Sequence, residues 1–130
     1  MRIIETAEEM RAWSQARRNE GHYIGFVPTM GALHEGHASL MRACVQQNDV
    51  SVLSVFVNPA QFAPHEDLDR YPRTFEADCA LAADIGIDAV YAPNAKRMYP
   101  PGYATYVEVE RLTEHLCGVS RPTHFRGVTT

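Results

Sequence analysis

The sequence has little cysteine and no closely spaced cysteine pair. Its three cysteines, Cys44, Cys79 and Cys117, lie far apart and form no C-x-x-C motif. This number and spacing argue against a disulfide framework and against a cysteine-based zinc site. Reduced thiols in a cytoplasmic protein are therefore the expectation.

Long hydrophobic runs and an excess of basic residues are also absent. No apolar stretch approaches the roughly 20 residues that a membrane-spanning helix needs, and Glu5, Glu8 and Glu9 interrupt any signal-peptide core at the N-terminus. Lys and Arg number 12 against 16 Asp and Glu, which gives a formal net charge of −4. A broad nucleic-acid surface would need the opposite balance. The sequence thus indicates no membrane and no nucleic-acid partner, while a small basic pocket for phosphates stays compatible with it.

The remaining composition is typical of a globular protein. The chain has 130 residues, 45% of them hydrophobic and 22% charged, a length that suits about one domain. The run Val50–Val57 is almost continuously apolar, as expected for a central strand covered on both faces. The alternation of such runs with helical spacings predicts an α/β fold, with a parallel sheet and helices on both faces. The expected strands are 23–27, 50–57, 88–92 and 105–109, and residues 2–4 are expected to form a short strand or an extended lead-in. The expected helices begin near Thr6, His37, Thr74, Ala95 and Arg111.

The first candidate site is a turn with two histidines between a predicted strand and a predicted helix. His34 and His37 flank the expected helix start, and Gly31 and Gly36 let the backbone turn sharply. A helix N-terminus beyond the carboxyl end of a parallel strand favours phosphate. Imidazoles there can donate hydrogen bonds to phosphoryl oxygens. The alternatives are a tight turn with two surface histidines, or a zinc site, which would need further ligands although no cysteine is nearby.

The second candidate site follows the strongest strand. Asn58 and Gln61 lie just after the run Val50–Val57, and their side-chain amides offer both donors and acceptors. Such groups can fix the orientation of a hydroxy acid. The alternative is that Asn58 begins a turn with Pro59 and that Gln61 is a solvated loop residue.

The third candidate is Asp78, at the edge of the apolar stripe of its predicted helix. A carboxylate in that position needs a partner, and Mg²⁺ is one candidate, because this cation prefers oxygen ligands. The alternative is an acidic residue of the first helical turn, favoured by the helix dipole. Arg73, nearby in sequence, is either a phosphate ligand or a structural ion-pair partner.

The fourth candidate combines Arg121, His124 and Arg126 in a basic, glycine-containing segment expected to be a turn before a strand. Three groups of this kind suit an anion. A solvated loop and a contact between subunits are equally good interpretations. No Ser/His/Asp or Cys/His set for nucleophilic catalysis is visible, so attack of one substrate on another fits better.

Four strings of the sequence resemble one enzyme family. His34–His37 reads H-E-G-H, the H-x-G-H signature of nucleotidyltransferases and class I aminoacyl-tRNA synthetases, within P-T-M-G-A-L-H-E-G-H at 28–37. The other strings are F-V-N-P-A-Q-F at 56–62, D-L-D-R-Y-P-R-T at 67–74 and R-P-T-H-F-R-G-V at 121–128. Together and in this order they resemble the pantothenate synthetase (pantoate–β-alanine ligase) family. The resemblance covers the whole chain but only the first half of the family's proteins.

The resemblance implies a fold, a reaction and roles for particular residues. Residues 1–130 would form a Rossmann-like nucleotide- and pantoate-binding domain. Pantoate would attack ATP to give pantoyl adenylate and pyrophosphate, and β-alanine would then attack the adenylate, releasing AMP and pantothenate, with Mg²⁺ on the phosphates. Gln61 would bind pantoate and β-alanine, with Asn58 beside it and Met30 and Phe62 against the pantoate methyl groups. The alternative for Met30 and Phe62 is that they are ordinary core residues. The segment implied to bind ATP is Met30, Gly31, Ala32, Leu33, His34, Glu35, Gly36 and His37, with His34 and His37 as catalytic residues and His37 as proton donor.

The sequence also departs from the family pattern. The family's G-E-K-D-type and M-S-S-R-type strings, which contact ATP, are not found. We therefore expect the C-terminal domain of the family to be absent, with weak binding and little turnover by this chain. The resemblance also implies a homodimer. Two rival interpretations are another H-x-G-H nucleotidyltransferase, which should lack F-V-N-P-x-Q-F, and a catalytically silent binding module.

Overall fold

The computed structural model describes residues 1–63, 66, 68–111 and 115–130. They form two compact units. The first unit comprises Met1–Val57 and Pro72–Met98, and the second comprises Asn58–Tyr71 and Tyr99–Thr130. The assignment of residues 1–130 to one domain of the family stays a prediction.

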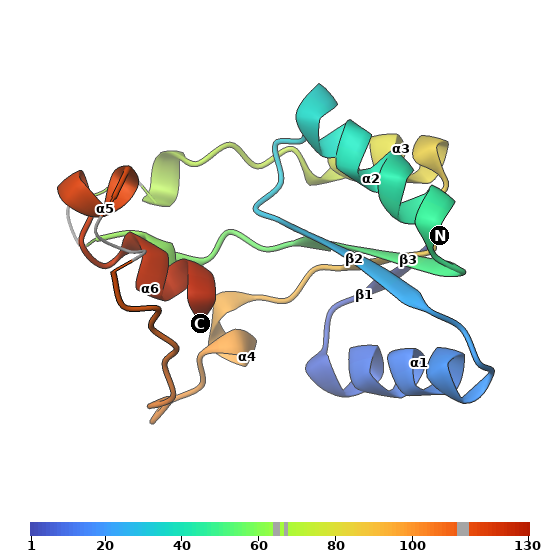
Figure 1. Ribbon diagram of the computed structural model, residues 1–130, viewed down its shortest axis with the longest axis horizontal. Coiled ribbons are helices and arrows are strands. Elements are labelled where there is room, and N and C mark those ends of the chain that lie inside the picture. The colour runs from blue at the N-terminus through green and yellow to red at the C-terminus, as the bar shows by residue number, and fades with distance from the viewer. Residues whose placement is uncertain (64–65, 67, 112–114) are drawn as a thin grey trace. The chain divides into compact units, whose positions relative to one another are not determined.

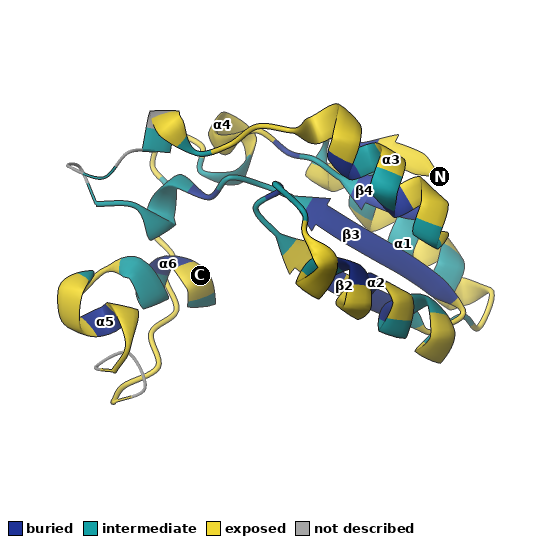
Figure 2. Cartoon of the chain, turned by 90° about the horizontal axis from the view of Figure 1, so that it is seen from above, coloured by how far each residue is buried: buried dark blue, intermediate teal, exposed yellow. Residues whose placement is uncertain are grey.

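The first unit is built on a parallel sheet of four strands in the order β1-β4-β3-β2 (Figure 1). All three strand pairings are parallel, and the central strand β3 is buried along nearly its whole length (Figure 2). This confirms the central position predicted from the apolar run in the sequence. The strands are β1 (Arg2–Ile4), β2 (Ile24–Thr29), β3 (Val50–Val55) and β4 (Ala89–Tyr91).

Helices cover both faces of this sheet, as predicted. In Figure 1, α1 lies on one face, and α2 and α3 lie together on the other. The buried side chains of Met41, Leu53, Ala82 and Val90 form the core beneath α2 and α3. The helices of the first unit are α1 (Ala7–Asn19), α2 (Glu35–Gln47), α3 (Phe75–Ile85) and α4 (Ala95–Met98).

The strand β2 extends further than the sequence suggested. The expected strand ended before Pro28, but β2 continues to Thr29. Proline lacks an N–H group and is tolerated because β2 lies at the edge of the sheet. The hydroxyl of Thr29 also donates to the carbonyl of Ser54 at 2.7 Å. This extension fixes the start of the turn that carries the histidines.

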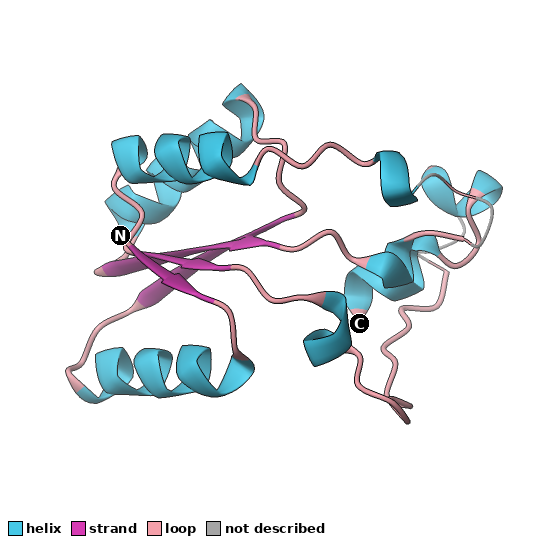
Figure 3. Cartoon of the chain, turned by 180° about the vertical axis from the view of Figure 1, so that it is seen from behind, coloured by secondary structure: helices cyan, strands magenta, loops and turns pink. Residues whose placement is uncertain are grey.

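The second unit has short helical elements and no strand among its described residues (Figure 3). The strand predicted at 105–109 is therefore wrong. Its main chain bonds instead to side chains: Val107 N–H donates to the Thr130 hydroxyl at 3.1 Å, and the Thr129 hydroxyl donates to the Val107 carbonyl at 2.5 Å. No neighbouring strand satisfies these groups, so the β-propensity of the segment is overridden. The elements of this unit are η1 (Pro59–Gln61), η2 (Leu68–Arg70), α5 (Cys117–Ser120) and α6 (His124–Thr129).

Two further predictions for the second unit are corrected. The helix expected from Arg111 is wrong where the structure describes it, because α5 begins only at Cys117, and positions 112–114 lie outside the described residues. The segment from Arg121, expected as a turn before a strand, leads into the helix α6. The three cysteines are free, as predicted. Within the part of the chain that the structure describes, no helix is long and apolar enough to cross a membrane.

Candidate active site

The two histidines of the H-x-G-H motif cap the helix α2. The Gly36 N–H donates to His34 Nδ1 at 3.1 Å, and the His34 N–H donates to His37 Nδ1 at 3.3 Å. This is a reciprocal cap of the first helical turn, with the ring centroids 4.0 Å apart. The helix begins at Glu35 and not at His37 as expected, because the rings themselves satisfy its first N–H groups.

The caps determine where each neutral ring carries its proton. An imidazole nitrogen that accepts a hydrogen bond is unprotonated, and the Nδ1 atoms of both His34 and His37 accept one. Their protons therefore lie on Nε2, an assignment made from the hydrogen-bond network. Both rings thus present an Nε2–H donor, which suits the oxygen atoms of a phosphate.

Gly36 is required by this arrangement. A Cβ atom at Gly36 would lie 2.9 Å from His34 Cε1 and 3.0 Å from His34 Nδ1. Such distances are too short for an undisturbed contact, so a side chain at this position would push the His34 ring out of the cap. The glycine of the motif keeps the imidazole against the helix N-terminus.

The environment of His37 favours its neutral form. Burial lowers the pKa of His37 below its ordinary value of 6.5, and His34 lowers it further, while Asp78 acts in the opposite direction. At pH 7 the ring is therefore a neutral hydrogen-bond donor. A phosphate close to it would favour the protonated form, because an opposite charge raises the pKa of an imidazole.

Asp78 holds the turn in front of the histidines. The N–H groups of Ala32 and Leu33 donate to its two carboxylate oxygens at 3.1 and 2.8 Å, and the Thr74 hydroxyl lies 3.2 Å from both oxygens. Gly31 and Ala32 have φ values of 81° and 50°, and Ala32 in this left-handed region is strained. The buried carboxylate, only 3% exposed, compensates for this strain by accepting both N–H groups.

The main-chain N–H groups of the turn already have partners within the protein. Those of Gly31, Ala32, Leu33, His34 and Gly36 donate to protein side chains. The turn therefore offers a phosphate fewer free main-chain N–H groups than an uncapped helix start would. A phosphate bound here would therefore depend mainly on the two Nε2–H groups.

The observed contacts of Asp78 bear on its predicted role as a Mg²⁺ ligand. Both carboxylate oxygens accept hydrogen bonds from the turn and from Thr74. Among the described residues, no three His, Cys, Asp or Glu side chains gather where they could hold a metal ion. The contacts fit the shaping of the turn better than direct coordination, and the metal role of Asp78 stays a prediction.

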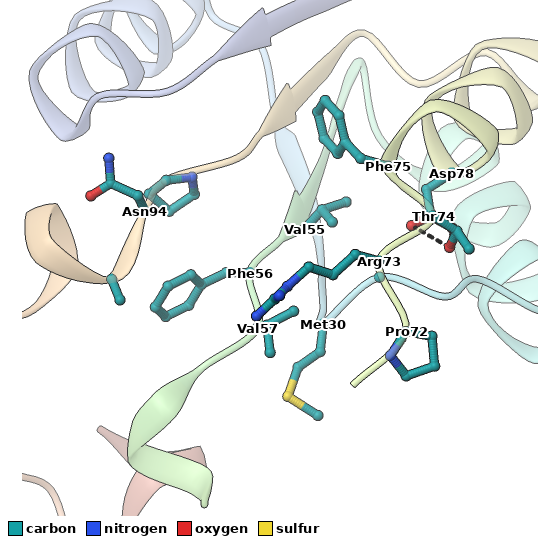
Figure 4. Close-up of a pocket in the computed structure, with 13 residues that line it drawn as sticks. Met30, Val55, Phe56, Val57, Pro72, Arg73, Thr74, Phe75, Asp78 and Asn94 are labelled. Atoms are coloured by element: carbon teal, nitrogen blue, oxygen red, sulfur yellow. Dashed lines mark hydrogen bonds between the residues drawn. The ribbon is translucent and has the colours of Figure 1, made fainter. Parts of the chain in front are cut away.

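A cavity of about 360 Å³ lies beyond the carboxyl ends of β2, β3 and β4. Figure 4 shows Met30, Phe56 and Val57 around it together with Arg73. The lining combines this apolar wall and Arg73 with the carboxylate of Asp78, which suits a small organic ligand with polar groups. Met30, which was predicted to contact pantoate, thus lines a cavity. Arg73 lines it too, and its two predicted roles, phosphate ligand or ion-pair partner, both stay predictions.

The second unit contains the other predicted ligand residues. Asn58 is 8% exposed. Its Oδ1 accepts from the Ala60 N–H at 3.1 Å and from the Tyr99 hydroxyl at 2.8 Å, while its Nδ2 donates to the Gly127 carbonyl at 2.9 Å. These contacts favour the turn-forming interpretation of Asn58, and its contact with pantoate stays a prediction.

Gln61 and Phe62 follow directly from this turn. Both are half-buried, and the Phe62 ring packs edge-to-face on Tyr71 with centroids 6.0 Å apart. The Gln61 carbonyl is contacted by Arg121 and His124. Arg126 lies elsewhere, 3.9 Å above the centre of the Tyr106 ring. The contact of Gln61 with Arg121 leaves no local pattern in the sequence, because 60 positions separate the two residues.

Comparison with known proteins identifies the family. The family model for pantoate-beta-alanine ligase matches residues 2–130. The chain belongs to the pantoate–β-alanine ligase family. Pantothenate synthetases of Moorella thermoacetica and Acetivibrio thermocellus are 61% and 58% identical to it over 130 residues. These matches confirm the resemblance inferred from the four strings.

Solved structures of this family confirm the fold. Pantothenate synthetase from Thermus thermophilus is 46% identical, with a TM-score of 0.87 over 98% of this chain and 45% of that chain. Pantoate–β-alanine ligase from Francisella tularensis, solved in complex with β-γ ATP and β-alanine, is 37% identical with a TM-score of 0.84, over 98% of this chain and 49% of that one. The chain spans about half the length of the curated relatives it matches, 46% of each of the two named above.

Proposed function

We propose that this chain supplies the phosphate-binding and pantoate-binding groups of a pantoate–β-alanine ligase. The observation that carries the proposal is the pair of capped histidines, His34 and His37, each with its Nε2–H group as a donor. The Francisella tularensis relative was crystallised with β-γ ATP and β-alanine, which supports the same substrates here. ATP would place its phosphates against the two rings.

The second substrate would be oriented by groups of different chemistry. Pantoate carries a carboxylate, two hydroxyls and two methyl groups. The Gln61 amide can bond to the polar groups, and Phe62 offers apolar surface to the methyl groups. Met30, which lines the cavity of the first unit, stays a predicted contact of pantoate.

The proposed reaction proceeds in two steps. The pantoate carboxylate attacks the α-phosphorus of ATP, which forms pantoyl adenylate and releases pyrophosphate. The amine of β-alanine then attacks the acyl carbon, and AMP leaves as pantothenate forms. The chain's own residues position the reactants and stabilise developing charge, with the Nε2–H groups of His34 and His37 donating to phosphate oxygens. His37 would give a proton to the departing pyrophosphate from its imidazolium form, which bound phosphate favours and in which Nδ1 no longer accepts the His34 N–H.

Mg²⁺ would accompany ATP and neutralise phosphate charge. Because the Asp78 oxygens are engaged by the turn, we propose that the ion binds to phosphate oxygens rather than to a dedicated protein site. The homodimer and the cytoplasmic location expected from the sequence stay predictions.

Calorimetric titration of the chain with pantoate, with and without Mg-ATP, tests this function. We expect the unmodified chain to bind pantoate. The double variant His34→Gln, His37→Gln should lose ATP binding and keep pantoate binding. Gln61→Ala should lose pantoate binding and keep ATP binding. Nicotinamide mononucleotide serves as the comparison ligand for a different nucleotidyltransferase.

Two outcomes would contradict the proposal. Tighter binding of the mononucleotide than of pantoate would favour another H-x-G-H enzyme. A folded chain that binds neither ATP nor pantoate would favour the silent binding module.

A further inference from the structure

The main-chain carbonyl of Gln61 receives two side chains from the R-P-T-H segment. Arg121 Nη2 donates to it at 2.9 Å, and His124 Nδ1 lies 3.0 Å from it. A carbonyl oxygen has two lone pairs and can accept both bonds. The carbonyl belongs to the last residue of η1, so these contacts fix the peptide between Gln61 and Phe62.

Arg121 is itself held in place. Its guanidinium forms an ion pair with Glu66, in which Nε donates to Oε1 and Nη2 donates to Oε2 at 3.1 Å. Glu66 Oε2 also accepts the Ala63 N–H at 2.6 Å. The same guanidinium lies 5.8 Å from the centre of the Phe62 ring. Arg121 therefore contacts both residues of the Gln61–Phe62 peptide: the main chain of Gln61 and the ring of Phe62.

His124 must use one particular tautomer in this contact. A carbonyl oxygen only accepts hydrogen bonds, so Nδ1 of His124 has to carry the proton. This is the opposite of the arrangement at His34 and His37, where Nδ1 accepts. The tautomer of His124 is therefore a spectroscopic signature of the contact.

The helix that carries His124 packs directly on η1. A Cβ atom at Gly127 would lie 2.2 Å from the Ala60 carbonyl oxygen, so only glycine permits this approach. Asn58 Nδ2 donates to the Gly127 carbonyl at 2.9 Å. The position of α6 relative to η1 is thus fixed by a close backbone contact and a buried hydrogen bond, independently of Arg121.

We propose that Arg121 and His124 are positioning residues that hold the Gln61 carbonyl and thereby aim the Gln61 and Phe62 side chains at pantoate. The proposal rests on the proposed function of Gln61 as a pantoate ligand. It is an alternative to the anion-binding interpretation of this basic segment, because Nε and Nη2 of Arg121 and Nδ1 of His124 already contact Glu66 and Gln61.

Pantoate and ATP affinities of matched variants test the proposal. Arg121→Gln should weaken pantoate binding about tenfold, the equivalent of about 1.4 kcal/mol, and leave ATP binding unchanged, because His34 and His37 belong to the first unit. Gln61→Asn shortens the positioned side chain but keeps its amide, and in that background Arg121→Gln should weaken the remaining pantoate binding by less than tenfold, because only Phe62 is then still positioned in full. Arg126→Gln is the matched control, because that guanidinium lies over Tyr106 and 3.4 Å from Glu108.

Two readouts detect the contact without any ligand. Arg121→Gln should shift the carbonyl ¹³C resonance of Gln61 upfield, as loss of a donor does, and the ¹⁵N resonances of His124 should show the Nδ1–H tautomer. His124→Asn keeps a donor near the Nδ1 position and should retain pantoate affinity, whereas His124→Ala should lose it. This pair remains informative even if Arg121→Gln does not fold.

The outcomes separate this proposal from the proposed function. If the unmodified chain binds pantoate but Arg121→Gln weakens ATP and pantoate equally, or if the Gln61 carbonyl resonance does not move, the positioning role is wrong and the function stands. Equal affinities of His124→Ala and His124→Asn would also overturn it. If the unmodified chain binds no pantoate, the proposed function fails and the positioning role fails with it.

Discussion

The two units hold their functional residues by different means. In the first unit, apolar side chains such as Met41, Leu53 and Val90 are completely buried between sheet and helices. In the second unit, the buried residues among those described are Asn58 and two glycines, so Asn58 has the only buried side chain there. One unit has an apolar core, and the other is cross-linked by hydrogen bonds between side chains and main chain.

This difference determines how each part of the site should respond to change. The histidine turn stands at the end of β2, on a sheet whose stability is spread over many apolar contacts. Gln61 depends on a few polar groups, each with an identified partner. Single substitutions should therefore act globally in the first unit and locally in the second.

The largest effect is expected in the core of the first unit. Leu53 in the central strand is 0% exposed, and Leu53→Ala should lower the free energy of unfolding by about 2–5 kcal/mol through lost burial and a cavity. Urea denaturation followed by circular dichroism measures this loss. Leu40→Ala, at a side chain that is 57% exposed, should change stability by less than about 0.5 kcal/mol. Equal losses for the two would show that the sheet does not carry the stability.

A smaller effect is expected where the core supports the turn. Asp78→Asn leaves the size of the side chain unchanged but replaces one carboxylate oxygen with an NH₂ group. This group is a donor and cannot accept the N–H of Ala32 or Leu33 that faces it. A cost of about 1.5–3 kcal/mol is expected for the loss of a charged hydrogen bond, together with weaker ATP-induced shifts of His34 and His37. Glu76→Gln, on the exposed side of the same first turn, is the control. Unchanged stability with a lost Mg²⁺ dependence would instead support Asp78 as a metal ligand.

In the second unit, Asn58→Ala should act locally. It removes a hydrogen bond to the Tyr99 hydroxyl and one to the carbonyl of the buried Gly127, and an unsatisfied buried group costs about 1–3 kcal/mol. Amide hydrogen exchange should speed up around α6 while the protection of β3 is retained. Gln46→Ala, an exposed amide on α2, should leave both patterns unchanged. Loss of protection in β3 as well would mean that the two units unfold as one.

The smallest effect concerns the pH dependence of His37. Its pKa is lowered below 6.5 by burial and by His34, so the unfolded chain binds more protons at this residue. The corresponding stability is present above pH 6.5 and declines as the pH falls from there toward the folded-state pKa. Because phosphate favours the imidazolium, ATP should raise this pKa. An NMR titration of the ring resonances checks both signs, and a free-state pKa above 6.5 would contradict the account.

The sequence allowed the first unit to be predicted well. The apolar run at 50–57 and the helical spacings around it locate the sheet, because burial on both faces and the helical period leave clear patterns. The H-x-G-H histidines were also found from local signals: glycines, a preceding strand and a following helix. The contact of Asp78 with Ala32 and Leu33 was missed, because it joins residues about 45 positions apart.

The second unit was predicted less well for the same physical reason. A β-rich segment such as 105–109 becomes a strand only if another strand pairs with it, and here Thr129 and Thr130 satisfy its main chain instead. The basic residues Arg121 and His124 suggested an anion, yet their observed partners are Glu66 and a carbonyl group. Polar networks of this kind depend on tertiary geometry, which spacing along the chain does not reveal.

One measurement tests the central claim most directly: an NMR titration of the chain with Mg-ATP and then with pantoate, observing the imidazoles of His34 and His37 and the side-chain amide of Gln61. The account predicts that ATP shifts both imidazoles without moving the Gln61 amide, and that pantoate shifts the Gln61 amide. A folded chain in which ATP leaves both imidazoles unmoved, or in which pantoate leaves Gln61 unmoved, would contradict it.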